Sequence, residues 1–395
     1  TDLILNGGML TPIRNVTSGA YYETIQAAID AADAGDVIEV QPGTYVEQLH
    51  ITTENLTVRG VGAEPVVIQS PDVLPLMFGI SAVNRPIVFV DGVSSFTLTG
   101  VTVDGNCLGN ANNRFYGIAF WDAGGTLEDV HVTNIMDNPF SGEQHGIGVY
   151  AYNSTPLKNY TINMNRVLID NFQKDGVFLN GNSESQNLTV NLDYVTIIGE
   201  GQTGVTAQNG IDINYCTGTV DNCNVSGIYY TGDYWTAVGL IVANCVDMVL
   251  TGNTVTDCLI AIYTKASTGV DLMSNQISGV CDCGIYDHHD YPSTGLVVNQ
   301  NTITGIPFAM WLPSGSTITN NILTGNEYAI VLSDGTGYTV TGNQLTDNYV
   351  HVHNFGAEPD VNTLIPTNTY APTYFIKDQV IYGKGAVLYV DAPLE

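Results

Sequence analysis

The stretch CDCGIYDHHDYP, residues 281–292, contains two cysteines, two histidines and three acidic residues. Imidazole and carboxylate groups exchange protons near neutral pH, and thiolate and imidazole groups also bind metal ions. Cys281 and Cys283 lie too close together for a standard zinc pair, and His288 and His289 lack the helical spacing of zinc-binding histidines. We therefore expect no metal site in this stretch and consider acid–base chemistry instead.

The charge of the whole chain limits its partners and cofactors. Its 395 residues include 10 Lys and Arg against 39 Asp and Glu, a formal net charge of −29. We expect no nucleic-acid partner, because binding a phosphate backbone requires clustered basic side chains. Calcium is the one cofactor left open: it suits an acidic chain, although no calcium-loop motif is present.

The apolar residues are distributed too evenly for a membrane span, which needs about 18 or more consecutive apolar residues. The chain opens on Thr1 without a signal-like apolar region, as either a mature secreted fragment or a trimmed chain would. We expect an extracellular protein, either secreted or on the cell surface.

A repeat organises the chain. The phrase LTGNTVTD, residues 250–257, returns as LMSNQISG, VNQNTITG, ITNNILTG and VTGNQLTD. Its shared asparagines recur every 20 to 26 residues and are Asn253, Asn275, Asn301, Asn321 and Asn343. The phrases alternate with period two and end at turn residues, which predicts short strands. Units of this length predict the coils of a parallel β-helix, in which the asparagines would bond from coil to coil.

The segment before the repeats predicts a helix. In YYETIQAAIDAADAG, Ile25, Ala28, Ile29 and Ala32 share one face, and Gly35 follows as a C-cap signal. Such a helix would cover the open edge of the first coil, which otherwise invites the addition of another strand.

Residues 21–51 and the repeats together resemble the pectate-lyase-like, right-handed β-helix superfamily, which includes polysaccharide lyases, C5-epimerases and β-helical glycoside hydrolases. The resemblance implies an all-β, single-stranded, right-handed parallel β-helix with an N-terminal capping helix. We expect one domain, residues 1–395. It would comprise a cap and first coil at about 1–50, repeat coils at about 51–355, and a C-terminal cap at about 356–395.

A second recurring phrase predicts which side chains leave the coils. In it a small residue precedes an apolar one, and we expect that apolar residue to point inward. The predicted inward residues are Ile118, Ile147, Val177, Ile211, Leu240, Ile262, Ile285, Met310 and Ile330. Outward positions then lie two and four residues after the small residue. The first set includes Phe178, Asp212, Tyr263, Tyr286 and Trp311, and the second includes Trp121, Tyr150, Asn180, Asn214, Lys265 and His288.

These outward residues predict a glycan-binding strip, because aromatic faces stack on sugar rings while a few polar groups fix orientation. Each residue alone is common on a protein surface, but their coincidence on neighbouring coils favours function. The predicted catalytic residues are His288, Tyr286, Lys265, Tyr263, Asp212 and Asp175. The predicted substrate-binding residues are His145, Asn180, Asn214, Trp121, Tyr150, Phe178, Asp287 and Trp311. Among these, Asp287 would need a turn to bring it outward, and His145 would face the strip from the strand's entry.

The chemistry that we favour from the sequence is β-elimination or C5-epimerisation of a uronate. It needs a group to neutralise the carboxylate, a base and an acid, and Lys265, His288 and Tyr286 or Tyr263 fit these roles. The phrase GIYDHHD is also similar to the Gly-hydrophobic-Asp-Pro-His motif of mannuronan C5-epimerases. There His288 matches in register, while Tyr286 replaces the Asp and Asp287 replaces the Pro.

Two alternatives stay open. Glycoside hydrolysis needs paired carboxyl groups, for which Asp175 and Asp212 are the best candidates and Glu143 or Asp233 are loop-borne substitutes. The net charge favours this reaction, since a chain at −29 repels polyuronates. The other alternative is a non-enzymatic surface or adhesion protein. In each case the expected partner is a polysaccharide or oligosaccharide, and either a monomer or a trimer fits the repeats.

Overall fold

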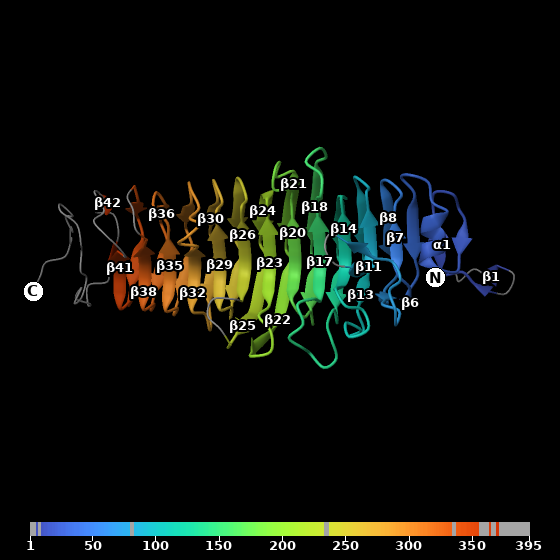
Figure 1. Cartoon of the computed structure of the whole chain (residues 1–395), viewed down its shortest axis with the longest axis horizontal. Coiled ribbons are helices and arrows are strands. Elements are labelled where there is room, and N and C mark those ends of the chain that lie inside the picture. Colours follow the sequence, from blue (N-terminus) through green and yellow to red (C-terminus); the bar gives the residue numbers. More distant parts are fainter. Residues whose placement is uncertain are drawn as a thin grey trace, which may run out of the picture.

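The computed structural model describes residues 5–6, 9–79, 83–232, 237–333, 337–354, 363–364 and 369–370. Within them the chain winds through three long sheets, and each coil contributes one strand to each sheet in turn. Strands of successive coils pair in parallel along the long axis of the molecule (Figure 1). The architecture is therefore the predicted parallel β-helix. None of the helices in the described part is long and apolar enough to span a membrane.

The three sheets are named here in the order in which a coil passes through them. Sheet 1 contains β7 (Leu49–Ile51), β10 (Phe78–Gly79), β11 (Val83–Asp91), β14 (Phe115–Trp121), β17 (Ile147–Tyr152), β20 (Asp175–Asn180), β23 (Asn209–Asn214), β26 (Val238–Ala243), β29 (Ile260–Lys265), β32 (Cys283–Asp287), β35 (Phe308–Leu312), β38 (Tyr328–Leu332) and β41 (Val350–Asn354). Sheet 2 contains β3 (Ile13–Asn15), β4 (Tyr21–Tyr22), β5 (Val37–Val40), β8 (Leu56–Gly60), β12 (Phe96–Thr99), β15 (Gly125–Glu128), β18 (Tyr160–Asn165), β21 (Leu188–Asp193), β24 (Cys216–Asp221), β27 (Met248–Thr251), β30 (Asp271–Met273), β33 (Val297–Asn299), β36 (Thr317–Thr319), β39 (Thr339–Thr341) and β42 (Thr363–Leu364). Sheet 3 contains β6 (Gly43–Val46), β9 (Val66–Gln69), β13 (Thr102–Asp104), β16 (His131–Thr133), β19 (Leu168–Asp170), β22 (Thr196–Thr203), β25 (Asn224–Tyr230), β28 (Thr254–Thr256), β31 (Gln276–Ser278), β34 (Thr302–Thr304), β37 (Ile322–Thr324), β40 (Gln344–Thr346) and β43 (Thr369–Tyr370). A separate antiparallel pair joins β1 (Leu5–Asn6) to β2 (Met9–Leu10).

The repeated asparagines occupy the turn from sheet 2 to sheet 3 and are fully buried. Asn275 donates its backbone N–H and its side-chain Nδ2 to Oδ1 of Asn301, both at 2.9 Å. Its Nδ2 also donates to the carbonyl of Leu250 at 3.0 Å. The same bonds repeat from Asn253 to Asn343. The predicted asparagine ladder is thus confirmed, and it satisfies polar groups that the turn buries.

The predicted N-terminal helix is confirmed as α1, Ile25–Asp30. Thr24 caps it, since its hydroxyl accepts the backbone N–H of Ala27. The buried side chains of α1 are Ile25, Ala28 and Ile29. They pack against the first strands of the β-helix, at the N-terminal end of the stack of coils (Figure 1).

One register prediction is wrong. We took Gly146 as the small residue of β17, but Val149 pairs with Ile118 and Val177, so Gly148 holds that place. Ile147 therefore points outward, and the inward position belongs to fully buried Val149. Both glycines precede an apolar residue, so the pattern alone did not separate them. Gly146 lies in the turn before the strand, with a φ of +84° that a glycine adopts readily.

The predicted C-terminal cap, residues 356–395, lies largely outside the described residues. The two short pieces described there, β42 and β43, add one parallel strand each to sheets 2 and 3.

Asn301→Ala tests the ladder. We expect the free energy of unfolding to fall by about 2–4 kcal/mol, because the buried N–H groups of Asn275 and the carbonyl of Leu272 lose their partner. Urea denaturation would measure the change. Asn191→Ala is the control: Asn191 is exposed and bonds only to the Asn163 side chain, so we expect a change within about 0.5 kcal/mol. Equal losses for both variants would contradict the ladder's role.

Candidate functional site

The outer face of sheet 1 carries three rows of side chains that follow the stack of coils. The entry row contains Tyr116, Ile147, Asp175, Asn209, Val238, Ile260, Cys283, Phe308 and Tyr328. The middle row contains Phe89, Ala119, Tyr150, Phe178, Asp212, Ile241, Tyr263, Tyr286, Trp311 and Val331. The exit row contains Asp91, Trp121, Tyr152, Asn180, Asn214, Ala243 and Lys265.

Two carboxyl groups lie on consecutive strands of this face. Asp175 on β20 is 5% exposed and accepts a hydrogen bond from Nδ2 of Asn209 at 2.9 Å. Asp212 on β23 is half-buried and accepts one from Nδ2 of Asn214 at 2.6 Å. Their Cα atoms are offset by three residues along the strands, about 10 Å, and by one ladder spacing of about 4.8 Å. The two side chains therefore belong to neighbouring rows, Asp175 to the entry row and Asp212 to the middle row.

Burial shifts the pKa of both acids. Burial raises the pKa of Asp175, while the ammonium of Lys174 and the bond from Asn209 favour its charged form. Burial also raises the pKa of Asp212, and the charge of Asp175 raises it further, to about 7. Both acids therefore hold their protons to higher pH than exposed carboxyl groups do, and Asp212, beside the charge of Asp175, keeps its proton close to neutral pH.

Long turns flank this part of sheet 1. On the entry side, residues 134–146 connect β16 to β17, and Nε2 of Gln144 donates to Oγ1 of Thr206 on a later turn at 3.4 Å. On the exit side, the connections formed by residues 153–159 and 181–187 are longer than those of the coils on either side. These turns project beyond the strands in the green part of the chain (Figure 1). They frame the two carboxyl groups from both sides of the sheet.

His145 belongs to the entry-side turn and not to the outer face, so its predicted place is wrong. Its Nε2 lies 3.1 Å from Oδ1 of Asp137, and its Nδ1 accepts the N–H of Phe115 at 3.5 Å. The second oxygen of Asp137 accepts bonds from Ser141 and Gln173. Both His145 and Asp137 are buried. This cluster fixes the shape of the turn.

The aromatic residues toward the N-terminus are less accessible than we predicted. Tyr150 lies in the middle row, and its side chain is only 6% exposed, so it offers no open face. Its ring stacks on that of Phe178 at 5.6 Å between centroids. Phe178 is half-buried and remains accessible next to Asp212. Trp121 and Tyr152 stack on each other at 5.2 Å in the exit row.

The predicted Tyr–His–Lys group does come together. The rings of Tyr263 and Tyr286 lie 5.7 Å apart, His288 contacts Tyr263 edge-on at 6.0 Å, and Trp311 contacts Tyr286 at 5.7 Å. Burial lowers the pKa of His288, and the ammonium of Lys265 lowers it further. Burial raises the pKa of Tyr263 and of Tyr286. The histidine is therefore neutral, and both phenols are protonated, at neutral pH.

Asp287 remains inside the coil, so its predicted outward displacement is wrong. It is 2% exposed, accepts a hydrogen bond from Oγ1 of Thr264 at 2.7 Å, and accepts the N–H of Ser293. These bonds anchor the turn that follows β32. In that turn Tyr291 lies under the ammonium of Lys265, 4.8 Å from it.

The sequence suggested one strip, but the structure has two groups on the same face. Asp175 and Asp212 lie on β20 and β23, whereas Tyr263 and Tyr286 lie on β29 and β32. Between them β26 contributes Ile241 to the middle row. Asp212 and Tyr263 are therefore two ladder spacings apart, about 10 Å. A long ligand would contact both groups, whereas one reacting bond would not.

His288, His289 and Asp290 place three ligand atoms within 4.8 Å of one another, which could hold a metal ion. Two imidazoles and one carboxylate suit a transition metal better than calcium, which prefers oxygen ligands. Oη of Tyr286 bonds to Nδ1 of His289 at 2.9 Å. The group lies in the turn after β32, away from Asp175 and Asp212.

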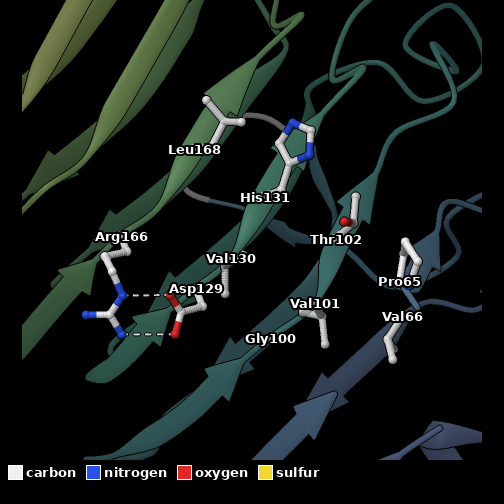
Figure 2. A pocket seen from close by; sticks show the side chains of 10 residues that line it. All are labelled: Pro65, Val66, Gly100, Val101, Thr102, Asp129, Val130, His131, Arg166 and Leu168. Carbon is white, nitrogen blue, oxygen red and sulfur yellow. Dashed lines mark hydrogen bonds and ion pairs between the residues drawn. The ribbon is translucent and has the colours of Figure 1, made fainter. Parts of the chain in front are cut away.

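A separate hollow of about 370 Å³ lies at the turn from sheet 2 to sheet 3 (Figure 2). Its lining is Pro65, Val66, Gly100, Val101, Thr102, Asp129, Val130, His131, Arg166 and Leu168. Arg166 binds both oxygens of Asp129, at 2.7 and 2.9 Å, and also Glu128. The arginine holds the pKa of Asp129 below its usual range. These charges are already paired, which makes the hollow a weaker candidate than the face of sheet 1.

Comparison with known proteins supports the fold. Residues 175–345 match the family model described as "Right handed beta helix region". The native lacto-N-biosidase of Eubacterium ramulus is similar at 12% identity and a TM-score of 0.50, over 90% of this chain. The chain spans 65% of the length of that protein. No curated protein sequence matches the chain significantly.

Two other solved structures are similar at lower TM-scores. The Streptococcus pneumoniae surface adhesin PfbA is 12% identical, with a TM-score of 0.49, over 88% of this chain and 86% of the adhesin. The A-module of mannuronan C-5 epimerase AlgE4 of Azotobacter vinelandii is 14% identical, with a TM-score of 0.39, over 88% of this chain and 94% of the module. The right-handed parallel β-helix that the sequence resemblance implied is thus confirmed as the fold.

Several residues near the carboxyl pair escaped the sequence analysis. Asn209 and Lys174 stabilise the charge of Asp175, and Phe78 covers Tyr150. Asn209 precedes Gly210 as Asp175 precedes Gly176, so the predicted register already placed the two side by side, but nothing in the repeat marked Asn209 as functional. Phe78 carried no signal, because it lies in a segment outside the repeat. Of the substitutes for the pair, Glu143 is exposed in the entry-side turn, and Asp233 lies outside the described residues.

Asp212→Asn tests the shifted pKa through stability. Asp212 has a folded-state pKa of about 7, above its unfolded value of about 4, so the stability that its protonated form contributes is lost as pH rises from about 4 to about 7. We therefore expect the variant to melt higher than the wild type at pH 8 and equally at pH 4. Thermal denaturation at both pH values measures this, with exposed Asp72→Asn as the unaffected control. A lower melting temperature at pH 8 would contradict the shift.

Proposed function

We propose that this chain is a glycoside hydrolase that cleaves a glycan on the outer face of sheet 1, with Asp175 and Asp212 as its two catalytic carboxyl groups. The observation that carries the proposal is their juxtaposition. They project from consecutive strands beside the accessible ring of Phe178, with long turns on both sides. Rigid strands are a suitable support for such a pair.

The two environments assign the two roles. Asp212 keeps its proton near neutral pH and can donate it to the leaving glycosidic oxygen. Asp175 in its charged form, which Lys174 and Asn209 favour, can take a proton from a water molecule that attacks the sugar. That water would lie between the entry row and the middle row, from which the two carboxyl groups project. Asn209 and Asn214 each hold one carboxyl oxygen and so orient the two groups.

The charge of the molecule points to a neutral glycan. With a formal charge of −29, the chain repels polyuronates and other anionic polymers over long distances. Phe178, Tyr263, Tyr286 and Trp311 are half-buried in the middle row, and such rings stack on the apolar faces of neutral sugars. The similarity to a lacto-N-biosidase supports a glycan-cleaving role for this fold. A secreted or cell-surface location would give access to such a polymer.

A second candidate function is β-elimination or C5-epimerisation at His288, as the sequence suggested. The observation that favours it is the neutral imidazole of His288 beside the ammonium of Lys265 and the protonated Tyr263 and Tyr286. These are a base, a neutralising cation and an acid. The net charge of the chain opposes this reaction, because its uronate substrate is anionic.

Substitution separates the two candidates. We expect Asp212→Asn and Asp175→Asn to lower the release of reducing ends by at least about a thousandfold, because each removes half of the acid–base pair. His288→Ala should retain most of the activity. A panel of neutral and acidic polysaccharides would be assayed for reducing ends and for the ultraviolet absorbance of unsaturated uronates.

The opposite pattern would replace the proposal. Absorbance that rises with the reducing ends and disappears in His288→Ala would establish elimination. No reaction with any glycan, combined with retained binding, would favour a non-enzymatic surface or adhesion protein.

The pH dependence of hydrolysis tests the roles. The rate should fall as pH rises through about 7, because Asp212 then loses the proton that it must donate. It should also fall in acid, below the raised pKa of Asp175, because the base becomes protonated. Measuring kcat from pH 3 to 10 gives both limbs. A rate that keeps rising above neutral pH would contradict the assignment of Asp212 as the acid.

A further inference from the structure

The exposure of the middle row changes abruptly along the stack. At its N-terminal end the side chains of Phe89, Ala119 and Tyr150 are at most 6% exposed. The next six residues are half-buried and accessible: Phe178, Asp212, Ile241, Tyr263, Tyr286 and Trp311. The next residue of the row, Val331, is fully buried. The accessible residues of the middle row therefore run from Phe178 to Trp311.

Phe78 makes the N-terminal end. The short strand β10 pairs antiparallel with β11 and places Phe78 over the outer face of sheet 1. Its ring lies 5.3 Å from Phe89, 5.1 Å from Trp121 and 5.7 Å from Tyr150, between centroids. This ring covers the middle row where a glycan lying along the sheet would otherwise continue.

The carboxyl groups lie close to this closed end. Toward the N-terminal end, Phe178 lies one ladder spacing, about 4.8 Å, from Asp212, and Tyr150 lies one spacing beyond Phe178. In the other direction, four spacings, about 19 Å, separate Asp212 from Trp311. One spacing is comparable in length with one sugar ring. The N-terminal side thus has room for about one or two sugars, and the C-terminal side for about four.

We propose that the enzyme is exo-acting: it binds a glycan by its chain end against Phe78 and releases about one or two sugars per cleavage. The inference rests on the proposed hydrolase function and deepens it. A free chain end fits the closed side, and the rest of the polymer extends over Tyr263, Tyr286 and Trp311. Phe78 acts as a specificity-determining residue and takes no part in the reaction.

Product analysis of the wild-type enzyme tests the inference. On a linear polysaccharide that it hydrolyses, we expect one short product from the first time point, while the size distribution of the polymer hardly changes. Size-exclusion and anion-exchange chromatography would follow both. A ladder of intermediate lengths with an early fall in polymer size would overturn exo action and leave the hydrolase function intact. In that case the polymer would continue beyond Phe78, over Trp121 and Tyr152 in the exit row. Absence of hydrolysis on any glycan would overturn both proposals.

Substitution of Phe78 tests its role as the end wall. Phe78→Ala should raise the share of longer products severalfold, because the chain can then continue over Tyr150. Phe78→Leu keeps more of the packing and should give an intermediate pattern. Met77→Ala is the matched control, since Met77 is its exposed neighbour and should leave the products unchanged. Melting temperatures would show that each variant is folded. An unchanged product length in folded Phe78→Ala would overturn this role.

Discussion

In a parallel β-helix each coil hydrogen-bonds only to the coil before it and the coil after it, so equivalent residues stack at one ladder spacing. Every other feature of this chain depends on that constraint. It lets Asn275 donate to Asn301 and makes the same bond recur along the turn. It also places Asp175 and Asp212 on neighbouring strands of the outer face, because β20 pairs with β23. The functional site is therefore determined by which residues occupy equivalent positions on neighbouring strands of sheet 1.

The repeat made much of this predictable from the sequence. A period of about two dozen residues, an asparagine in each unit and alternating apolar residues are enough to specify coils, ladder and inward rows. The register failed at β17, where Gly146 and Gly148 both precede an apolar residue. Periodicity gives the face of a residue but does not separate two candidates two positions apart. Tyr150 was therefore placed in the wrong row.

Contacts made by residues outside the repeated phrases could not be predicted from the sequence. His145 and Asp137 pair within a long turn, and Phe78 reaches the sheet from a segment with no repeat. Such contacts depend on how irregular backbone folds back, and local patterns carry no information about that. Asp287 shows a related limit: an acid in an inward position suggested a displaced strand, yet Thr264 and Ser293 satisfy it in place. Buried polar groups need partners, and a linear pattern does not show them.

The energetic cost of the carboxyl pair supports its functional role. Asp175 and Asp212 lie on neighbouring strands of a partly buried face, so their charged forms repel each other and lose hydration. Both effects destabilise the folded chain near neutral pH. Hydrogen bonds from Asn209 and Asn214 offset only part of that cost. Elsewhere on the sheet the stack uses Ile, Val and aromatic residues, which stabilise without such a penalty. On β20 and β23 two acids are retained instead, between long turns and beside an accessible aromatic ring, where their shifted pKa values suit proton transfer.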